Sequence, residues 1–236
     1  DGRQQDAGLM ASRDQRGRAI RGWRDWYGGH KMEYSPSEKF RYELSENYNN
    51  KNRYDLKNSS MDDKAMSGIM PGDPDWAYEK YQSYNVRAMM EHSPSEQHKV
   101  YLSYLRDESF RDVDSLYRVV HKQRHTYNIP RLLWTYAGKN HRLTTGVEMI
   151  NEQLRFDLNP DGYDDVKSLN TAAMYVQDEL WNHKKLSFVV GVRGDWSNSF
   201  GWMVTPKVSA KYVFGNFAAR ANYSAGYRTP SLKEMY

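Results

Sequence analysis

Apolar and polar residues alternate one by one in the C-terminal part of the chain. Between residues 185 and 196 one parity is apolar and the other polar or small, with Val189 as the exception. The apolar parity consists of Leu186, Phe188, Val190 and Val192, and the other parity of Ser187, Gly191, Arg193 and Asp195. A period of two residues is typical of a strand with one apolar and one polar face. The pattern therefore predicts a strand over this segment.

Two further segments, 204–212 and 217–228, repeat the alternation, and no comparable helical period occurs in the chain. Their second parity carries cationic, hydroxyl and amide side chains. Together with the first strand, this parity includes the charged residues expected to face the interior, which are Arg193, Asp195, Lys207, Lys211, Arg220 and Arg228. We expect consecutive strands with one apolar and one charged face, and we expect Arg228 to lie on the charged face of the last strand.

Short turns and long polar stretches alternate between the predicted strands. Near-identical Ser-Pro-Ser turns occur at 33–40 and 91–98, and a proline flanked by serines is a turn signal. Further short turns lie at 136–143, 181–186 and 213–217, and long polar stretches at 49–76, 107–122 and 157–170. We therefore expect roughly ten strands of about ten residues each between residues 22 and 228, with tight turns at one end and long loops at the other.

Strands of this length suit a tilted membrane crossing better than the usual globular strand of about 5–6 residues. Short turns on one side, long loops on the other, and an apolar outside with a polar inside describe an outer-membrane barrel. Aromatic residues near the predicted strand ends match the interfacial girdles of such barrels. These residues are Trp23, Trp26, Tyr27, Tyr34, Tyr42, Tyr48, Trp134, Tyr136, Trp181, Trp196 and Trp202.

The pattern thus favours an all-β fold, a transmembrane antiparallel up-and-down β-barrel. A soluble all-β meander whose apolar face packs into a core stays open, because alternation alone does not separate the two. Composition excludes some functions. The chain has no cysteine, which rules out disulfides, thiolate zinc sites and cysteine nucleophiles. The net charge of +4 is small and its basic residues are interspersed with acidic ones, so we expect no nucleic-acid partner.

Four motifs follow one another from residue 172 onward. The first is Tyr175, Gln177, Asp178 and Glu179; the second is Gly191, Arg193 and Asp195; the third is Thr205, Pro206, Lys207 and Ser209. The fourth consists of Gly226, Tyr227, Arg228, Pro230, Ser231, Leu232, Glu234 and Tyr236. In this order the motifs resemble the C-terminal half of TonB-dependent outer-membrane receptors.

The resemblance implies that residues 1–236 are part of the receptor's β-barrel domain, about ten strands of a plugged barrel of about 22 strands. The plug domain, the TonB-contacting segment and the last strands would lie outside this chain, and the barrel would be a monomer in a bacterial outer membrane. In this family the fourth motif leads up a strand into an extracellular loop. The charges of the lumen would then face the plug.

The same resemblance implies TonB-driven import of a large, scarce nutrient captured outside the cell. Haem or another iron chelate is the expected ligand, and cobalamin is the alternative. A passive porin has the same shape without a plug. An outer-membrane enzyme would need a nucleophile and a base within hydrogen-bond reach, and the sequence offers no such pair in a convincing position. We therefore expect no enzymatic activity and no covalently bound cofactor.

Two histidines are candidates for contact with haem, whose iron takes His or Tyr as an axial ligand. Of seven histidines, only His121 and His125 are expected at the junction of an extracellular loop and a strand, and their even spacing puts both on one face. If that face lines the lumen, nearby cations are available to the haem propionates: Arg118, Arg124 and Arg131. Polar loop histidines without a ligand are the simpler alternative.

An acidic stretch around a proline and a glycine offers hard oxygen ligands of the kind that Ca²⁺ prefers. Its carboxylates are Asp157, Asp161, Asp164 and Asp165. Their spacing is not that of an EF-hand loop, and a solvated acidic loop is the alternative interpretation.

Overall fold

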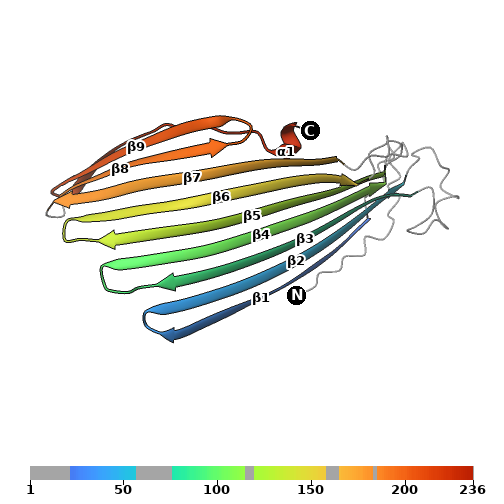
Figure 1. Cartoon of the computed structure of the whole chain (residues 1–236), viewed down its shortest axis with the longest axis horizontal. Helices are drawn as coiled ribbons and strands as arrows, with labels where there is room; N and C mark the ends of the chain where they lie inside the picture. Colours follow the sequence, from blue (N-terminus) through green and yellow to red (C-terminus); the bar gives the residue numbers. More distant parts are fainter. Residues whose placement is uncertain (1–21, 57–75, 115–119, 158–164, 183–184, 236) are drawn as a thin grey trace.

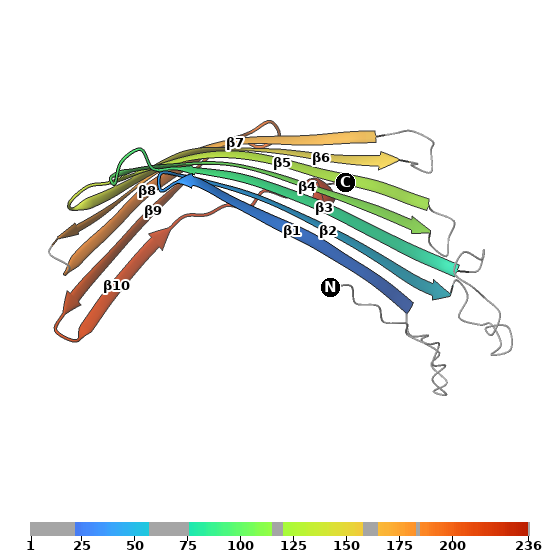
Figure 2. The same cartoon turned by 90° about the horizontal axis from the view of Figure 1, so that it is seen from below.

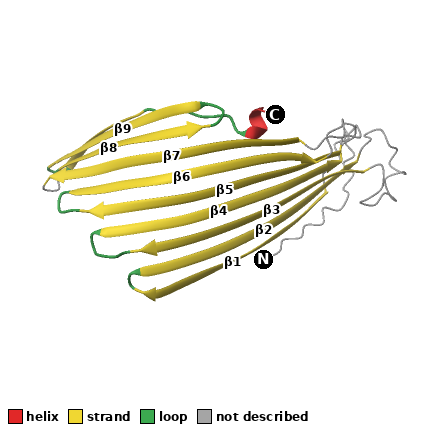
Figure 3. Cartoon of the chain, in the orientation of Figure 1, coloured by secondary structure: helices red, strands yellow, loops and turns green. Residues whose placement is uncertain are grey.

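A single antiparallel sheet of ten strands makes up almost all of the described chain (Figures 1 and 3). The computed structural model describes residues 22–56, 76–114, 120–157, 165–182 and 185–235. The strands pair in chain order, and β1 and β10 form the two edges. They are β1 (Gly22–Ser37), β2 (Phe40–Leu56), β3 (Trp76–His92), β4 (His98–Asp114), β5 (Val120–Ala137), β6 (His141–Asp157), β7 (Asp165–Asn182), β8 (Leu186–Ser197), β9 (Gly201–Phe214) and β10 (Phe217–Ser224).

The sheet is curved like part of a barrel wall, with the short helix α1 (Leu232–Met235) inside the curve (Figure 2). Leu232 packs on Leu154 of β6 and Leu169 of β7, so the parity of these residues marks the concave face. Val190 and Val208, which oppose each other across β8 and β9, have the other parity and are exposed on the convex face. The predicted apolar and charged faces are therefore confirmed, and the apolar face is the outer one.

A belt of neighbouring rings follows the tight turns on the convex face. Neighbouring pairs include Tyr34 and Tyr42, with ring centroids 6.4 Å apart, and Trp134 and Tyr136, also at 6.4 Å. Other members are Phe40, His92, His98, His141, Tyr212, Phe214 and Phe217. Rings in this position are the interfacial girdle of a membrane barrel. The register assigns Tyr27 and Trp181 to the concave face instead, so the expectation for these two was wrong.

All strands but β10, which has eight residues, are longer than the expected ten, and β5 and β7 reach 18. Residues 49–56 and 107–114, which the sequence suggested were loops, continue β2 and β4. Their polarity fits a wall that rises beyond the membrane, where both faces meet water; there Arg111 donates to Glu79 at 2.8 Å. The strict alternation of connections also fails twice at the loop end, because only residues 115–119 join β4 to β5 and only residues 198–200 join β8 to β9.

The C-terminal motif does not extend the last strand. β10 ends at Ser224, residues 225–231 have no regular structure, and α1 follows, so the strand register expected for Arg228 was wrong. Pro230 has no N–H to donate to a ladder. Ser231 and Glu234 form the start of a helix: the Ser231 amide donates to Glu234 Oε2 at 2.8 Å, as in a capping box. Within the described residues, no helix is long and apolar enough to cross a membrane.

A charge placed on the convex face should weaken assembly of the barrel. We expect Val190→Lys to lower the free energy of unfolding from lipid by about 2–4 kcal/mol, because this side chain meets hydrocarbon. Urea titration of the full-length protein refolded into phospholipid vesicles measures the change. Val189→Lys is the matched control, since Val189 lies on the concave face opposite Ser209. Equal losses in the two variants would contradict the assignment of the faces.

Candidate functional site

Four ionised side chains form a network on the concave face between β5 and β8. Arg131 Nε donates to Glu148 Oε2 at 2.6 Å, and Arg193 Nη2 donates to Glu148 Oε1 at 2.9 Å. Arg193 also holds Asp195, with Nε 3.0 Å from Oδ1. The carboxylates are buried, with Glu148 6% and Asp195 2% exposed. In the register Ala173 lies between Glu148 and Asp195, and its small side chain leaves Arg193 room to reach across β7.

A second polar cluster lies beside this network and is covered by α1. His125 is 5% exposed, and its Nε2 lies 2.7 Å from Glu152 Oε1. The same oxygen accepts the Tyr127 hydroxyl at 2.9 Å and the Leu232 amide at 3.1 Å. Leu232 is buried among Leu154, Leu169, Phe156 and Met235. Glu152 therefore ties α1 to the wall of the barrel at the position where an apolar cluster also holds it.

The segment that precedes α1 approaches the first network. Burial and the neighbouring Asp195 carboxylate raise the pKa of the Tyr227 hydroxyl, so Tyr227 lies beside the first network. Arg228 pairs with Glu234, so this arginine contributes to the fold of the segment itself. The C-terminal motif thus acts as a strap on the concave face, held at Glu152 and by Leu232, with Tyr227 beside Asp195. The signal in the sequence that predicts its helical turn is the Ser-x-x-Glu spacing of Ser231 and Glu234.

A hollow of about 470 Å³ lies on the concave face over β5–β9. Its wall carries three cations and one carboxylate, namely Arg131, Arg193, Lys207 and Glu148. Hydrogen-bonding groups complete the lining: Tyr175, Gln177, Thr205 and Ser224. Lys207, Lys211 and Arg220 follow one another on this face and form no ion pair with another described residue. An excess of guanidinium and ammonium groups in a polar hollow suits an anionic ligand or an acidic protein surface.

The structure separates the residues that the sequence grouped as haem contacts. Arg124 lies on the convex face, where it pairs with Glu108, whereas His125 faces the concave side. Arg131 joins the concave network. His121 belongs to β5 opposite Val113, but its side chain lies outside the described residues, as does Arg118. His125 and Arg131 are therefore the two candidates that the structure places on the same face.

The proposed calcium ligands lie mostly outside the described residues. Asp161 and Asp164 are not described, and the side chain of Asp157 is not described either. Asp165 forms an ion pair with Lys167 at 3.0 Å. Among the residues that the structure describes, no group of three or more His, Asp or Glu side chains is arranged to hold a metal ion.

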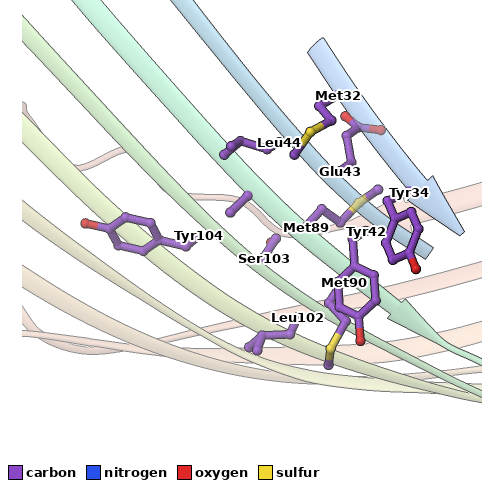
Figure 4. A pocket seen from close by; sticks show the side chains of 11 residues that line it. Met32, Tyr34, Tyr42, Glu43, Leu44, Met89, Met90, Leu102, Ser103 and Tyr104 are labelled. Carbon is purple, nitrogen blue, oxygen red and sulfur yellow. The ribbon is translucent and has the colours of Figure 1, made fainter. Parts of the chain in front are cut away.

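An apolar hollow of about 320 Å³ lies on the convex face near the tight turns of β1–β4 (Figure 4). Aliphatic, thioether and aromatic side chains line it, among them Met32, Tyr42, Leu44, Met90, Leu102 and Tyr104. This surface is apolar and suits contact with lipid acyl chains, whereas the hollow on the concave face is charged.

The comparisons with known proteins agree with this architecture. Residues 2–236 match the family model described as TonB dependent receptor-like, beta-barrel. The chain belongs to this family. No curated protein sequence matches the chain significantly. Among solved structures, the siderophore receptor PirA from Pseudomonas aeruginosa has a TM-score of 0.72 and 12% sequence identity, over 89% of this chain and 35% of that one.

Two other solved barrels are similar at lower scores. A FadL homologue from Pseudomonas aeruginosa has a TM-score of 0.48 and 12% identity, over 86% of this chain and 60% of that chain. The toluene transporter TbuX from Ralstonia pickettii has a TM-score of 0.39 and 10% identity, over 89% and 64%. At such identities the likeness to PirA shows the fold of the receptor barrel, and this chain spans about a third of the PirA chain.

Loss of the buried leucine should release the strap from the receptor barrel. We expect Leu232→Ala to lower the free energy of docking by about 2 kcal/mol, because the side chain leaves water completely in the docked state. Hydrogen–deuterium exchange of the peptide 226–236 in the full-length receptor measures the opening. Lys233→Ala, on the exposed side of α1, is the control and should leave exchange unchanged. Equal exchange in both variants would contradict docking through Leu232.

Acid should also loosen the strap. The Ser231 amide, together with Arg228, holds the pKa of Glu234 below its usual range. A carboxyl with a depressed pKa stabilises the docked state above its ordinary pKa, and this contribution is lost as pH falls through the lowered value. We expect faster exchange of the peptide 226–236 at pH 3 than at pH 7, after correction for the intrinsic rate. Glu234→Gln should exchange faster at pH 7 and show a smaller difference between the two conditions; an unchanged difference would exclude Glu234 as the cause.

Proposed function

We propose that this chain is part of the wall of a bacterial outer-membrane receptor that imports a large, scarce nutrient. The match to the receptor-barrel family over residues 2–236 is the observation that carries this proposal. The two faces of the sheet support it, because an apolar outside with an aromatic belt suits lipid and a charged inside suits a filled lumen. The proposed localisation is the outer membrane, and the proposed state is a monomeric barrel.

TonB is the proposed source of energy, acting through a plug domain that is not part of this chain. The row formed by Lys207, Lys211 and Arg220 supports a folded acidic partner in the lumen, since these cations have no described partner in the wall. A passive porin would leave the same cations in water. Import that stops in cells lacking TonB, while the receptor is still present in the outer membrane, would distinguish the two.

The proposed ligand is an anionic iron chelate, with haem as the first candidate. The hollow on the concave face supports this choice, because the Lys207 ammonium in its wall forms no ion pair with another described residue and can meet a carboxylate such as a propionate. His125 is the candidate axial ligand, although its Nε2 is held by Glu152 and covered by α1. Haem would therefore have to displace the strap before His125 reached the iron. Since PirA is a siderophore receptor with the same fold, an iron–siderophore chelate is the second candidate, and cobalamin is the third.

An absorbance titration of the full-length receptor in detergent tests the ligand. We expect haemin to give a Soret shift that saturates at an equimolar ratio and that cyanocobalamin does not compete away. Replacing His121 and His125 with alanine should abolish the shift, because the axial ligand is lost. His141→Ala is the matched control, since His141 belongs to the aromatic belt on the convex face.

The possible outcomes lead to different conclusions. A shift that survives in the double variant would contradict the role of these histidines and leave haem as the ligand. No shift with the unmodified receptor would contradict haem, and quenching of tryptophan fluorescence by ferric siderophores or by cobalamin would then identify the ligand class.

A further inference from the structure

Three arginines gather on the convex face of β4–β6, on the side that faces lipid. Arg124 and Arg155 are direct cross-strand partners, and Arg106 lies nearby on β4, opposite Asn128. Like charges directly opposite each other destabilise a sheet. An anion bound beside Arg124 and Arg155 would therefore stabilise this pairing.

The arginines line a hollow of about 310 Å³. The rest of the lining is neutral and consists of Thr126, Asn128, Gln153 and Val166. Three of these residues carry a hydroxyl or an amide that can donate a hydrogen bond. The described lining thus combines three guanidinium groups with neutral donors and includes no carboxylate.

One carboxylate, Glu108, lies at the margin of the hollow and is shared by two of the arginines. Arg106 Nη2 donates to Glu108 Oε2 at 2.8 Å, and Arg124 pairs with the other oxygen. Arg106 Nη1 also reaches Asn128 Oδ1 at 3.4 Å. The Arg124 guanidinium lies over the Phe110 ring, 5.0 Å from its centroid. A single carboxylate shared by two cations leaves a net positive charge, and these contacts hold the guanidinium groups at the hollow.

The height of the hollow points to the ligand. Along β5, Arg124 is ten residues above Trp134 of the aromatic belt, which is about 34 Å along a strand and about 26 Å vertically at a tilt of about 40°. This matches the apolar band of about 25 Å in outer-membrane barrels. On β9 the same spacing separates Tyr212 of the belt from Trp202, whose side chain is 75% exposed. At the height above the belt where β9 has the interfacial Trp202, β5 therefore has Arg124.

We propose that the hollow defined by Arg106, Arg124 and Arg155 binds a phosphate group on the headgroup of a lipid in the leaflet opposite the tight turns. This inference rests on the outer-membrane location proposed above. Guanidinium forks match phosphate geometry and bind it in a bidentate manner. The exposed apolar surface below, at Leu132 and Tyr104, provides the contact for the acyl chains of the same lipid. Charge above and hydrocarbon below together select an anionic lipid over a soluble anion.

Native mass spectrometry of the full-length receptor, released from vesicles into mild detergent, tests the site with diphosphoryl lipid A as the probe. We expect one tightly bound lipid in the unmodified receptor. The double variant R106Q/R124Q should bind about thirtyfold more weakly, as the loss of two lipid-facing cations predicts. Arg111→Gln is the matched control, because Arg111 is also on β4 and paired with one carboxylate, but lies on the concave face.

A gain of affinity provides an independent arm that does not depend on the stability of the double variant. Glu108→Gln removes the carboxylate that competes for Arg106 and Arg124, so this variant should bind lipid A several-fold more tightly. Lipid A from which the phosphates have been removed should bind neither to the unmodified receptor nor to the Glu108→Gln variant. Equal retention by R106Q/R124Q and the unmodified receptor, an equal loss in Arg111→Gln, or equal binding of the phosphate-free lipid would each overturn the proposal.

The test also separates this inference from the proposed import function. A receptor that binds its nutrient normally but shows no arginine-dependent lipid would contradict the lipid site alone. A receptor that does not insert into membranes would contradict the outer-membrane location on which the site rests. Retention of a protein in place of the lipid would reassign the hollow to a protein partner and overturn the proposal.

Discussion

The register of the ten-stranded sheet is the constraint on which every other feature depends. A strand in lipid must pair all its backbone groups with its neighbours. The two faces of the strand therefore differ only in their side chains, which point alternately to one face and the other. A slip by one residue would exchange the two faces of a strand. Such a slip at β8 would put Arg193 and Asp195 in hydrocarbon and Val190 in the lumen. Apolar packing against lipid and ion pairing inside therefore specify the same register.

Charge pairing inside the wall follows from this register. Glu148 meets Arg131 on β5 because they are direct partners, and it meets Arg193 on β8 because Ala173 between them is small. Removing one partner of a buried pair leaves an uncompensated charge, whereas the complete network satisfies both carboxylates. The cations nearer the β10 edge have no such partners in the described wall. One part of the wall thus has its charges paired within the sheet. In the other part, nearer β10, the cations remain available to an additional anionic surface.

The faces of the strands were predictable from sequence because side chains alternate between the two faces of a strand whatever its tilt or curvature. The strap was not, because its position depends on a contact between Leu232 and residues about seventy positions earlier, Leu154 and Leu169. Alternation in residues 217–228 suggested a longer strand, and Pro230 with the Ser231 and Glu234 pair overrode it. The candidate site was only half predictable for a similar reason: His125 and Arg131 share a face, but Arg124 lies on the other one.

The contrast between Arg124 and His125 shows how one strand carries two separate chemistries. These consecutive residues have opposite environments: His125 is enclosed with Glu152 beneath α1, and Arg124 stands with Arg155 on the outer surface. A soluble sheet would bury one of these faces in a core and lose its chemistry. In a membrane barrel both faces remain available, one to the lumen and one to lipid. The spacing of ten residues along β5 from Trp134 in the aromatic belt to Arg124 matches the thickness of a membrane. The other face of the same strand lines the proposed ligand site.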